Sequence, residues 1–472
     1  MAYGGPSMNP PAMSGAIPGG SSNLKQVKLD RESELRIEVS DEPLRLRVVN
    51  GTAEIFGAEL PPEIWRTFPP RLKFAVRFGS LSPTISSEVE DRSFDSCQVF
   101  TWYGATIEMD GVTETDYTAD EVEVLTPMVS YVNVHAILDA RRRFAKASTS
   151  TDSEPPQGPR VIVVGPTDSG KSTLTKMLIS WAAKQGWKPT FVDLDVGQGS
   201  ITIPGSIAAT PIEMPLDPVE GFPLDMALVY YYGHTTPANN VELYKTMVKE
   251  LAQVLERQFL GNPESRAAGM VINTMGWIDG IGYELLLHAI ETFNASVVLV
   301  LGQEKLFSML KDVLKSKSNV DVVKLHKSGG VVARNRDYRK VARSSRIQEY
   351  FYGLSKELSP YANTSSFSDV QVFRIGGGPQ APRSALPIGS DPVSNPLRVT
   401  PVNIEERDLL HSILAVSYAE EPDQIVSSNV SGFVYVTEVD VLRKKITYLA
   451  PSPGALPSKI LVAGSLTWLE SH

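Results

Sequence analysis

The sequence is poor in the features that mark disulfide-bonded, membrane-spanning and strongly basic proteins. It has one cysteine, Cys97, in 472 residues, which excludes an intramolecular disulfide and suits a reducing compartment. No apolar run approaches the ~20 residues that a helix needs to cross a bilayer, and no signal peptide is recognisable. We therefore expect no membrane association. The net charge of −9 provides no general attraction for nucleic acid, so RNA would need a local basic groove.

The remaining composition is that of a globular protein with several domains. Hydrophobic residues make up 42% and charged residues 21% of the chain, both ordinary values. A chain of this length is enough for about two to four domains. Residues 1–22 are rich in glycine, proline, serine and methionine, and we expect them to form a disordered tail.

One stretch carries the clearest chemical signal. Residues 161–164 predict a buried strand, residues 174–184 a helix, and residues 165–173 between them read G-P-T-D-S-G-K-S-T. This matches the phosphate-loop pattern, in which glycines let backbone N–H groups face phosphate oxygens, the lysine reaches the β- and γ-phosphates, and the hydroxyl binds Mg²⁺. The alternative is an ordinary glycine-rich turn. We predict a nucleotide site from Gly165, Asp168, Ser169, Gly170, Lys171, Ser172 and Thr173, with Ser172 as a Mg²⁺ ligand.

The acidic residue in this loop is unusual. A carboxylate at Asp168 would repel a phosphate unless it points outward or serves another partner.

Hydrophobic patterns divide the rest of the chain into a β region, an α/β region and a second β-rich region. Short alternating strands at 35–39, 44–48, 52–56, 73–78, 99–108 and 122–125 predict an N-terminal antiparallel β domain over 23–130, with a polar insertion loop at 80–96. A helix at 133–147 and a polar linker complete residues 131–159.

The central and C-terminal regions follow different patterns. Apolar strands at 190–195, 269–273, 296–301 and 320–325 alternate with helices at 241–258, 282–293 and 344–353, which predicts an α/β fold with a doubly wound parallel sheet over 160–358. Strands at 370–373, 430–436 and 446–449, with a helix at 406–414, predict a β-rich mixed domain over 359–472.

Two carboxylates end the second strand of the central region. Asp193 and Asp195 are two residues apart, which places both on one strand face at the edge where such sheets bind ligands. We predict that Asp193 serves the metal by holding a Mg²⁺-bound water and that Asp195 is a general base. The alternative is a pair of turn residues that cap the strand.

Other polar segments have less specific interpretations. Residues 329–340 combine two glycines with a basic run that includes Arg334 and Arg339, which suits either a mobile lid over phosphate or a solvated basic helix. The polar loop at 233–240 is most simply a helix cap made by Asn239 or Asn240. We expect the tryptophans, Trp277 included, mostly in the core.

Several strings together resemble one family. Residues 165–173, 193–199, 233–237 and 346–353, with flanking matches at 53–60 and 417–421, resemble the polynucleotide 5′-hydroxyl-kinase family. Within it the chain is most similar to the kinase-like subunit of the eukaryotic pre-mRNA cleavage and polyadenylation complex, and we expect a fungal form. The longer loop at 80–96 departs from the family pattern.

The resemblance implies a set of functional residues and partners. ATP with Mg²⁺ would lie between the first two domains, where Glu34 and Lys73 match the family's nucleotide contacts from the N-terminal domain. Residues 235–239 match a clasp over the RNA end. The catalytic set would be Asp195, Lys171, Arg334 and Arg339. The implied partners are RNA, bound directly or through the complex, and the scaffold subunit that binds the RNA polymerase II tail. The implied location is the nucleus.

Family members divide into kinases and catalytically silent forms, so three hypotheses remain. The first is an ATP-binding subunit required for endonucleolytic cleavage in polyadenylation-dependent mRNA 3′-end formation, with a largely structural ATP. The second is an active ATP-dependent RNA 5′-hydroxyl kinase. The third is a regulatory GTPase, which ranks last because no Asn-Lys-x-Asp string is present to select guanine.

Overall fold

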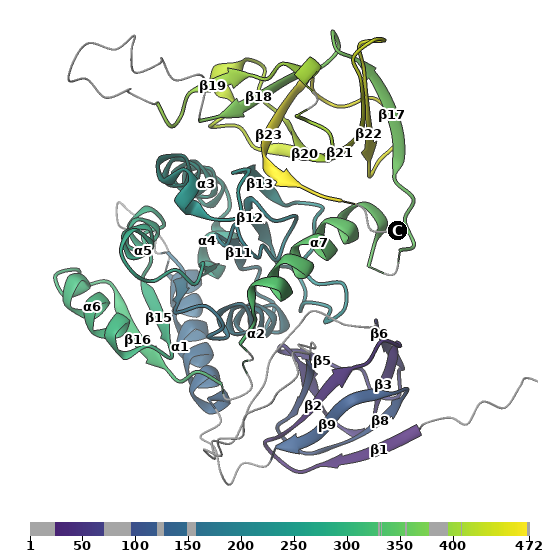
Figure 1. The fold of residues 1–472 in the computed structure, drawn as a ribbon. Helices are drawn as coiled ribbons and strands as arrows, with labels where there is room; N and C mark the ends of the chain where they lie inside the picture. The colour runs from purple at the N-terminus through teal and green to yellow at the C-terminus, as the bar shows by residue number, and fades with distance from the viewer. Residues whose placement is uncertain are drawn as a thin grey trace, which may run out of the picture.

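The computed structural model describes residues 24–69, 96–119, 127–148, 157–328, 331, 333–354, 356–376, 395–406 and 408–469. Within them, N-terminal strands, a central α/β unit and C-terminal strands follow one another from the bottom to the top of Figure 1. The predicted tail, the strands at 73–78 and 122–125, most of the loop at 80–96, and Lys73 lie outside the described residues. The described helices include none that is long and apolar enough to cross a membrane.

The N-terminal strands form two sheets packed face to face. One has the order β1-β8-β3-β6 (Leu24–Leu29, Ala105–Asp110, Leu44–Gly51, Arg66–Phe68). The other has the order β5-β4-β7-β2-β9 (Ala58–Glu59, Glu54–Ile55, Ser96–Thr101, Ser33–Val39, Thr113–Ala119). In β3, Leu44, Leu46 and Val48 are buried while the residues between them are exposed or half-buried, the alternation that a sheet with one face on a core requires. The predicted antiparallel β architecture is confirmed for these strands.

The central sheet confirms the predicted α/β class and adds two strands. Its order is β13-β12-β11-β14-β10-β15-β16, of which β11, β14, β10, β15 and β16 are parallel (Thr190–Asp193, Met270–Asn273, Arg160–Val164, Val297–Leu301, Asp321–Leu325). The added strands, β12 (Ser206–Pro211) and β13 (Leu228–Tyr231), are antiparallel to their neighbours and occupy one edge. Sequence patterns missed them because they are antiparallel to their neighbours and no crossover helix joins them to β11, so they break the strand–helix alternation.

Helices cover the central sheet and connect its strands. They are α1 (Met128–Ala147), α2 (Lys171–Lys184), α3 (Val241–Gly261), α4 (Pro263–Ala268), α5 (Ile281–Thr292), α6 (Glu304–Leu314) and α7 (Arg336–Tyr352). Helix α1 begins earlier than predicted, directly after Pro127. Helix α7 also begins earlier and contains residues 336–340, the end of the basic segment that was considered as a lid. The side chain of Asn335 caps the helix by accepting from the Tyr338 N–H at 2.7 Å.

The C-terminal sheet has the order β17-β22-β21-β20-β23-β18-β19 (Tyr361–Ser366, Lys445–Ala450, Val430–Asp440, Ser412–Ser417, Ile460–Thr467, Gln371–Ile375, Val399–Pro401). The predicted helix at 406–414 is wrong. Its last three residues, 412–414, belong to β20, which pairs with β21 and β23 in the middle of the sheet. Ile413, Leu414 and Ala415 are fully buried there, and a short apolar run of this kind fits a core strand as well as a helix.

The N-terminal strands dock on α2. The Trp181 indole N–H donates to both carboxylate oxygens of Glu54 at 3.3 Å, and Lys184 pairs with Glu59. Gly57 has φ 79°, and a Cβ there would lie 3.0 Å from the Met177 carbonyl oxygen. Only a glycine therefore allows the β4–β5 turn to approach α2 this closely.

The C-terminal sheet holds the far half of α7 through aromatic residues. Phe351 of α7 stacks on Trp468 with ring centroids 6.2 Å apart, and Tyr350 contacts Phe433 edge-on at 5.5 Å. The Phe433 N–H also donates to the Tyr350 hydroxyl at 3.0 Å. This end of α7 is therefore fixed to the C-terminal sheet, while its first turns lie over the central unit (Figure 1).

Two glycine substitutions test the docking of the N-terminal strands. Gly57→Ala should destabilise the protein by about 1–2 kcal/mol for its left-handed backbone and about 1–3 kcal/mol more for overpacking against α2. Gly186→Ala is the matched control, because Gly186 has φ 83° but nothing lies within 4 Å of a Cβ there. Thermal melts should show the larger decrease in melting temperature for Gly57→Ala. Equal decreases would contradict the close packing on α2.

Candidate nucleotide-binding site

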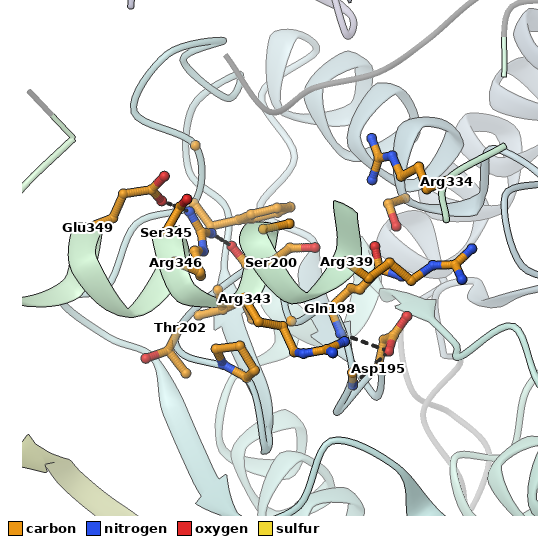
Figure 2. A pocket seen from close by; sticks show the side chains of 18 of the residues that line it. Asp195, Gln198, Ser200, Thr202, Arg334, Arg339, Arg343, Ser345, Arg346 and Glu349 are labelled. Carbon is orange, nitrogen blue, oxygen red and sulfur yellow. Dashed lines mark hydrogen bonds and ion pairs between the residues drawn. The ribbon is translucent and has the colours of Figure 1, made fainter. Parts of the chain in front are cut away.

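A cavity of about 1090 Å³ lies where the phosphate loop, the loop after β11 and α7 meet. Figure 2 shows α7 running along it, with arginine side chains that extend toward the loop bearing Asp195, Gln198 and Ser200. All of residues 167–173 line this cavity. The predicted phosphate-loop residues are therefore brought together, apart from Gly165, which lies beneath the loop.

The backbone of the loop is shaped to hold an anion. Gly165 has φ 157° and Gly170 has φ 90°, and a Cβ at Gly165 would approach the Leu301 carbonyl oxygen to 2.8 Å. Gly170 is the N-cap of α2 and has no side chain to satisfy the first N–H groups of the helix, so these remain available to a phosphate. The Ser169 hydroxyl is buried and has no hydrogen-bond partner within the described residues.

Lys171 is buried at the start of α2 with its ammonium turned back on the loop. It donates to the carbonyl oxygens of Gly165 at 3.0 Å and Pro166 at 2.8 Å. Burial lowers the pKa of Lys171 to about 8, against the opposing pull of Asp195 and Asp168. A bound phosphate beside Lys171 would favour the charged form of the lysine, because it adds negative charge to that of the two aspartates.

The two aspartates after β11 have different surroundings. Asp193 is 2% exposed, and its oxygens accept from the N–H groups of Ser200 at 2.6 Å and Asp195 at 3.1 Å and from the Asn273 amide at 3.0 Å. Burial and the neighbouring Asp195 raise the pKa of Asp193 to about 6. Asp193 is not among the described residues that line the cavity, and its hydrogen bonds fit the alternative, a residue that shapes the turn; its role beside Mg²⁺ stays a prediction.

Asp195 is the carboxylate that faces the cavity. One of its oxygens accepts from the N–H groups of Gly197 at 2.9 Å and Gln198 at 3.1 Å, which orients the group (Figure 2). Burial raises the pKa of Asp195, while Lys171 and the two N–H groups oppose the shift. Within the described residues no cluster of three or more His, Cys, Asp or Glu side chains is arranged to hold a metal. Among the oxygen-bearing side chains that line the cavity, Ser172 and Asp195 fit a Mg²⁺ that shares a nucleotide's phosphates.

The unusual acid of the loop, Asp168, serves another partner, which was one of the two interpretations. Oδ2 of Asp168 accepts from the Arg334 N–H at 2.9 Å and from the Arg339 guanidinium at 2.7 Å. The residues before and within the first turn of α7 are thus tied to the phosphate loop. The Arg334 guanidinium lies over the Tyr338 ring, 5.1 Å from its centroid.

Two further arginines on α7 line the cavity and were missed as site residues. Arg343 and Arg346 follow Arg339 at helical spacing, so all three lie on one face (Figure 2). Arg346 donates to the Ser200 carbonyl oxygen and pairs with Glu349 at 2.9 Å. Burial and the neighbouring Arg339 and Arg336 lower the pKa of Arg343. The i, i+4, i+7 spacing of these arginines was the available signal.

The N-terminal strands contribute different residues from those expected. Phe56 and Pro69 line the cavity, whereas the Glu34 carboxylate is buried and accepts from Nε of Arg36 at 2.7 Å. Glu34 is not among the described residues that line the cavity, and its nucleotide contact stays a prediction. The resemblance had pointed to it by position alone.

The far rim of the cavity is formed by two loops of the central unit. Thr235, Thr236 and Pro237 line it, and the predicted helix cap is confirmed nearby, where the Asn240 side chain accepts from the Leu243 N–H at 3.0 Å. Trp277 also lines the cavity rather than lying wholly in the core. The expectation concerned the tryptophans as a set, and Trp277 meets it in part, because it is half-buried and packs against the core.

A pair of aspartate variants separates the two roles. Asp193→Ala should lower the melting temperature, because three donors lose their acceptor and each buried unsatisfied group costs about 1–3 kcal/mol. Asp195→Asn keeps an acceptor for the N–H groups of Gly197 and Gln198, so its melting temperature should change little. Differential scanning calorimetry in the absence of nucleotide measures both. A stable Asp193→Ala variant would contradict the structural assignment.

Comparison with known proteins identifies relatives along the whole chain. Family models described as "mRNA cleavage and polyadenylation factor CLP1 P-loop", "Pre-mRNA cleavage complex II protein Clp1" and "N-terminal beta-sandwich domain of polyadenylation factor" match residues 165–353, 358–470, and 28–92 with 85–145. A "Protein CLP1 homolog" of Arabidopsis thaliana is 83% identical over 471 residues and 100% of both chains. A "Polyribonucleotide 5'-hydroxyl-kinase Clp1" of Gallus gallus is 40% identical, over 96% of this chain and 99% of its own.

A similar solved structure and the source organisms of the relatives add to this comparison. A structure described as the wild-type Clp1p–Pcf11p complex has a TM-score of 0.76 at 25% identity and covers 96% of this chain and 100% of its own. The expectation of a fungal form is not borne out, since relatives at 83% and 53% identity are both from Arabidopsis thaliana. The family resemblance itself is confirmed. With a matching sequence from end to end and a P-loop at its centre, this chain belongs to the Clp1 family.

Proposed function

We propose that this protein is the ATP-binding Clp1 subunit of a nuclear pre-mRNA cleavage complex, required for cleavage in polyadenylation-dependent 3′-end formation, with an ATP that is largely structural. One observation carries the proposal. The phosphate loop lies where all three parts of the chain meet, since α2 supports the N-terminal strands and α7 reaches the C-terminal sheet. A nucleotide bound at this loop would stabilise all three parts of the chain, either by direct contact or through α2 and α7.

The energetic effect of such a ligand is large on the scale of protein stability. A ligand at 100 times its Kd adds about 2.7 kcal/mol to the stability of the form that binds it. The cavity suits a triphosphate with Mg²⁺, because Lys171, Arg339 and Arg343 surround it with cations and Asp195 and Ser172 offer oxygen ligands.

The partner we propose is the cleavage-complex scaffold subunit that also binds the RNA polymerase II tail. Support comes from the similar solved structures, which are described as Clp1p bound to Pcf11p. RNA would then reach the protein directly or through the complex. The chain's net charge of −9 favours delivery through the complex, because free RNA would meet little long-range attraction.

A second candidate function is an ATP-dependent RNA 5′-hydroxyl kinase. The observation that favours it is Asp195, which faces the cavity beside Lys171 with a raised pKa, as a general base requires. In this mechanism Asp195 takes the proton of the 5′-hydroxyl, whose oxygen attacks the γ-phosphorus while the ADP oxygen leaves. Lys171, Arg334 and Arg339 stabilise the charge on the transferring group. Relatives at 40% identity carry the name of this activity.

A pH titration tests the nucleotide site. The pKa of Lys171 is about 8 without ligand, and neighbouring phosphates would raise it. Between these two values the free lysine is largely neutral and the bound one charged, so ATP binding should take up a proton above about pH 8. Calorimetry in buffers of different ionisation enthalpy measures this uptake.

The control for this titration is Lys171→Met, which keeps the length of the side chain. It should bind ATP more weakly, melt at a lower temperature in the presence of ATP and show no proton uptake. Full ATP occupancy with unchanged melting in this variant would refute the structural-ATP proposal.

Turnover assays decide between the two functions. If the protein is a kinase, Mg²⁺-ATP should label a 5′-hydroxyl RNA oligonucleotide, Asp195→Asn should abolish labelling while ATP stays bound, and Arg339→Ala should slow it by on the order of 10³-fold. If ATP is structural, the purified protein should carry intact ATP after days and label nothing, even with its complex partners. Robust labelling would overturn the structural role in favour of the kinase.

A further inference from the structure

A strained acidic residue lies in the phosphate loop, at the cavity where the phosphates would bind. Asp168 has φ 53°, in the left-handed region that a residue with a side chain enters at a cost and that aspartate and asparagine tolerate best. Backbone strain of this kind persists where the surrounding contacts require it. A carboxylate so near to bound phosphates also has an electrostatic cost, so both costs call for a compensating contact.

The contact that compensates lies at the start of α7. A single oxygen of Asp168 accepts from the Arg334 N–H at 2.9 Å and from the Arg339 guanidinium at 2.7 Å. The side chains of Arg339 and Asp168 are 26% and 15% exposed, which shields their ion pair from solvent more than a surface pair. One acidic oxygen thus joins the phosphate loop to the backbone that enters α7 and to its first turn.

We propose that Asp168 is a positioning residue that latches the first turns of α7 over the phosphate loop before any nucleotide binds. Nε of Arg339 is buried and has no hydrogen-bond partner within the described residues. Arg339 therefore keeps a donor in reserve and can bridge Asp168 to a phosphate oxygen without releasing the latch. The latch rests on the contacts above, whereas the bridge rests on the proposed nucleotide site.

The two ends of α7 are held in different ways, which predicts where the helix would loosen. Its second half is fixed to the C-terminal sheet by Tyr350 and Phe351 and by Trp468, whose indole N–H donates to the Ser344 hydroxyl at 3.0 Å. Without the latch, the first half should therefore move while the second half stays in place. The second half of α7 therefore serves as an internal control for movement of the first half.

Hydrogen–deuterium exchange on the full-length protein without nucleotide tests the latch. Asp168→Asn suits the left-handed backbone, keeps an acceptor for the Arg334 N–H and removes only the charge. Amides at 334–343 should exchange at least about tenfold faster, as expected for loss of a charged, part-buried hydrogen bond. Amides at 344–352 and the melting temperature should be unchanged.

Matched variants show whether the effect comes from the contact itself. Asp337→Asn neutralises an exposed acid in the same helical turn and should leave exchange unchanged. Arg339→Gln should reproduce the effect of Asp168→Asn, and the double variant should add nothing, since both changes remove one interaction. Unchanged exchange in Asp168→Asn, or additive effects in the double variant, would overturn the latch.

Adding saturating Mg²⁺-ATP tests the bridge separately. Phosphates should restore protection at 334–343 in Asp168→Asn, because Arg339 regains an anionic partner, and should not restore it in Arg339→Gln. If the wild type binds ATP but protection returns in neither variant or in both, the bridge is wrong. If the wild type binds no ATP, the proposed function fails, and the nucleotide-free exchange still decides the latch.

Discussion

The structure around the cavity depends on how the positive charges of its buried lysines and arginines are balanced by negative charges. Lys176, one turn along α2 from Lys171, is buried between the rings of Phe56 and Phe222 at 5.2 and 5.6 Å, and its pKa is lowered by burial and then by Arg346 and Arg334. Desolvated cations that lie this close repel one another unless anions are near. The aspartates of the site supply part of the negative charge that balances these cations, and a bound polyphosphate would supply the rest. An anion at this point would therefore stabilise the fold as well as serve chemistry.

The same need to balance positive charge with a polyphosphate explains why the residues of the site do not distinguish the two proposed functions. A structural ATP and a reacting ATP need the same phosphate loop, the same lysine and the same cations on α7. They differ in whether a hydroxyl can reach Asp195 and whether product can leave. A helix that is fixed at the aromatic end and latched at Asp168 favours a site that is formed in advance. Such preorganisation suits a permanently held ligand and equally an aligned transition state.

The sequence predicted the parts of the fold and the site that local patterns encode. The strand–loop–helix around Lys171 and the buried parallel strands were predicted because glycine spacing and apolar runs reflect local geometry. The antiparallel strands β12 and β13 and the strand β20 were not, because no strand–helix alternation marks the first two and an apolar run like that of β20 fits a helix as well, so only tertiary pairing decides their structure. Asp193 and Asp195 could be placed on one strand face but not distinguished, since only the Ser200 and Asn273 contacts show which one is turned inward.

The contact between Asp168 and Arg339 shows most clearly how two segments that are distant in the sequence can change each other's interpretation. From sequence, Asp168 was an electrostatic problem in the loop, and the basic run at Arg339 was either a lid or a solvated helix. The two segments are 171 residues apart, so no pattern could join them. Once joined, each explains the other: the carboxylate is tolerated in the phosphate loop because it binds the arginine, and the arginine is held at the loop because it binds the carboxylate. The charge that would weaken phosphate binding instead positions a cation for it.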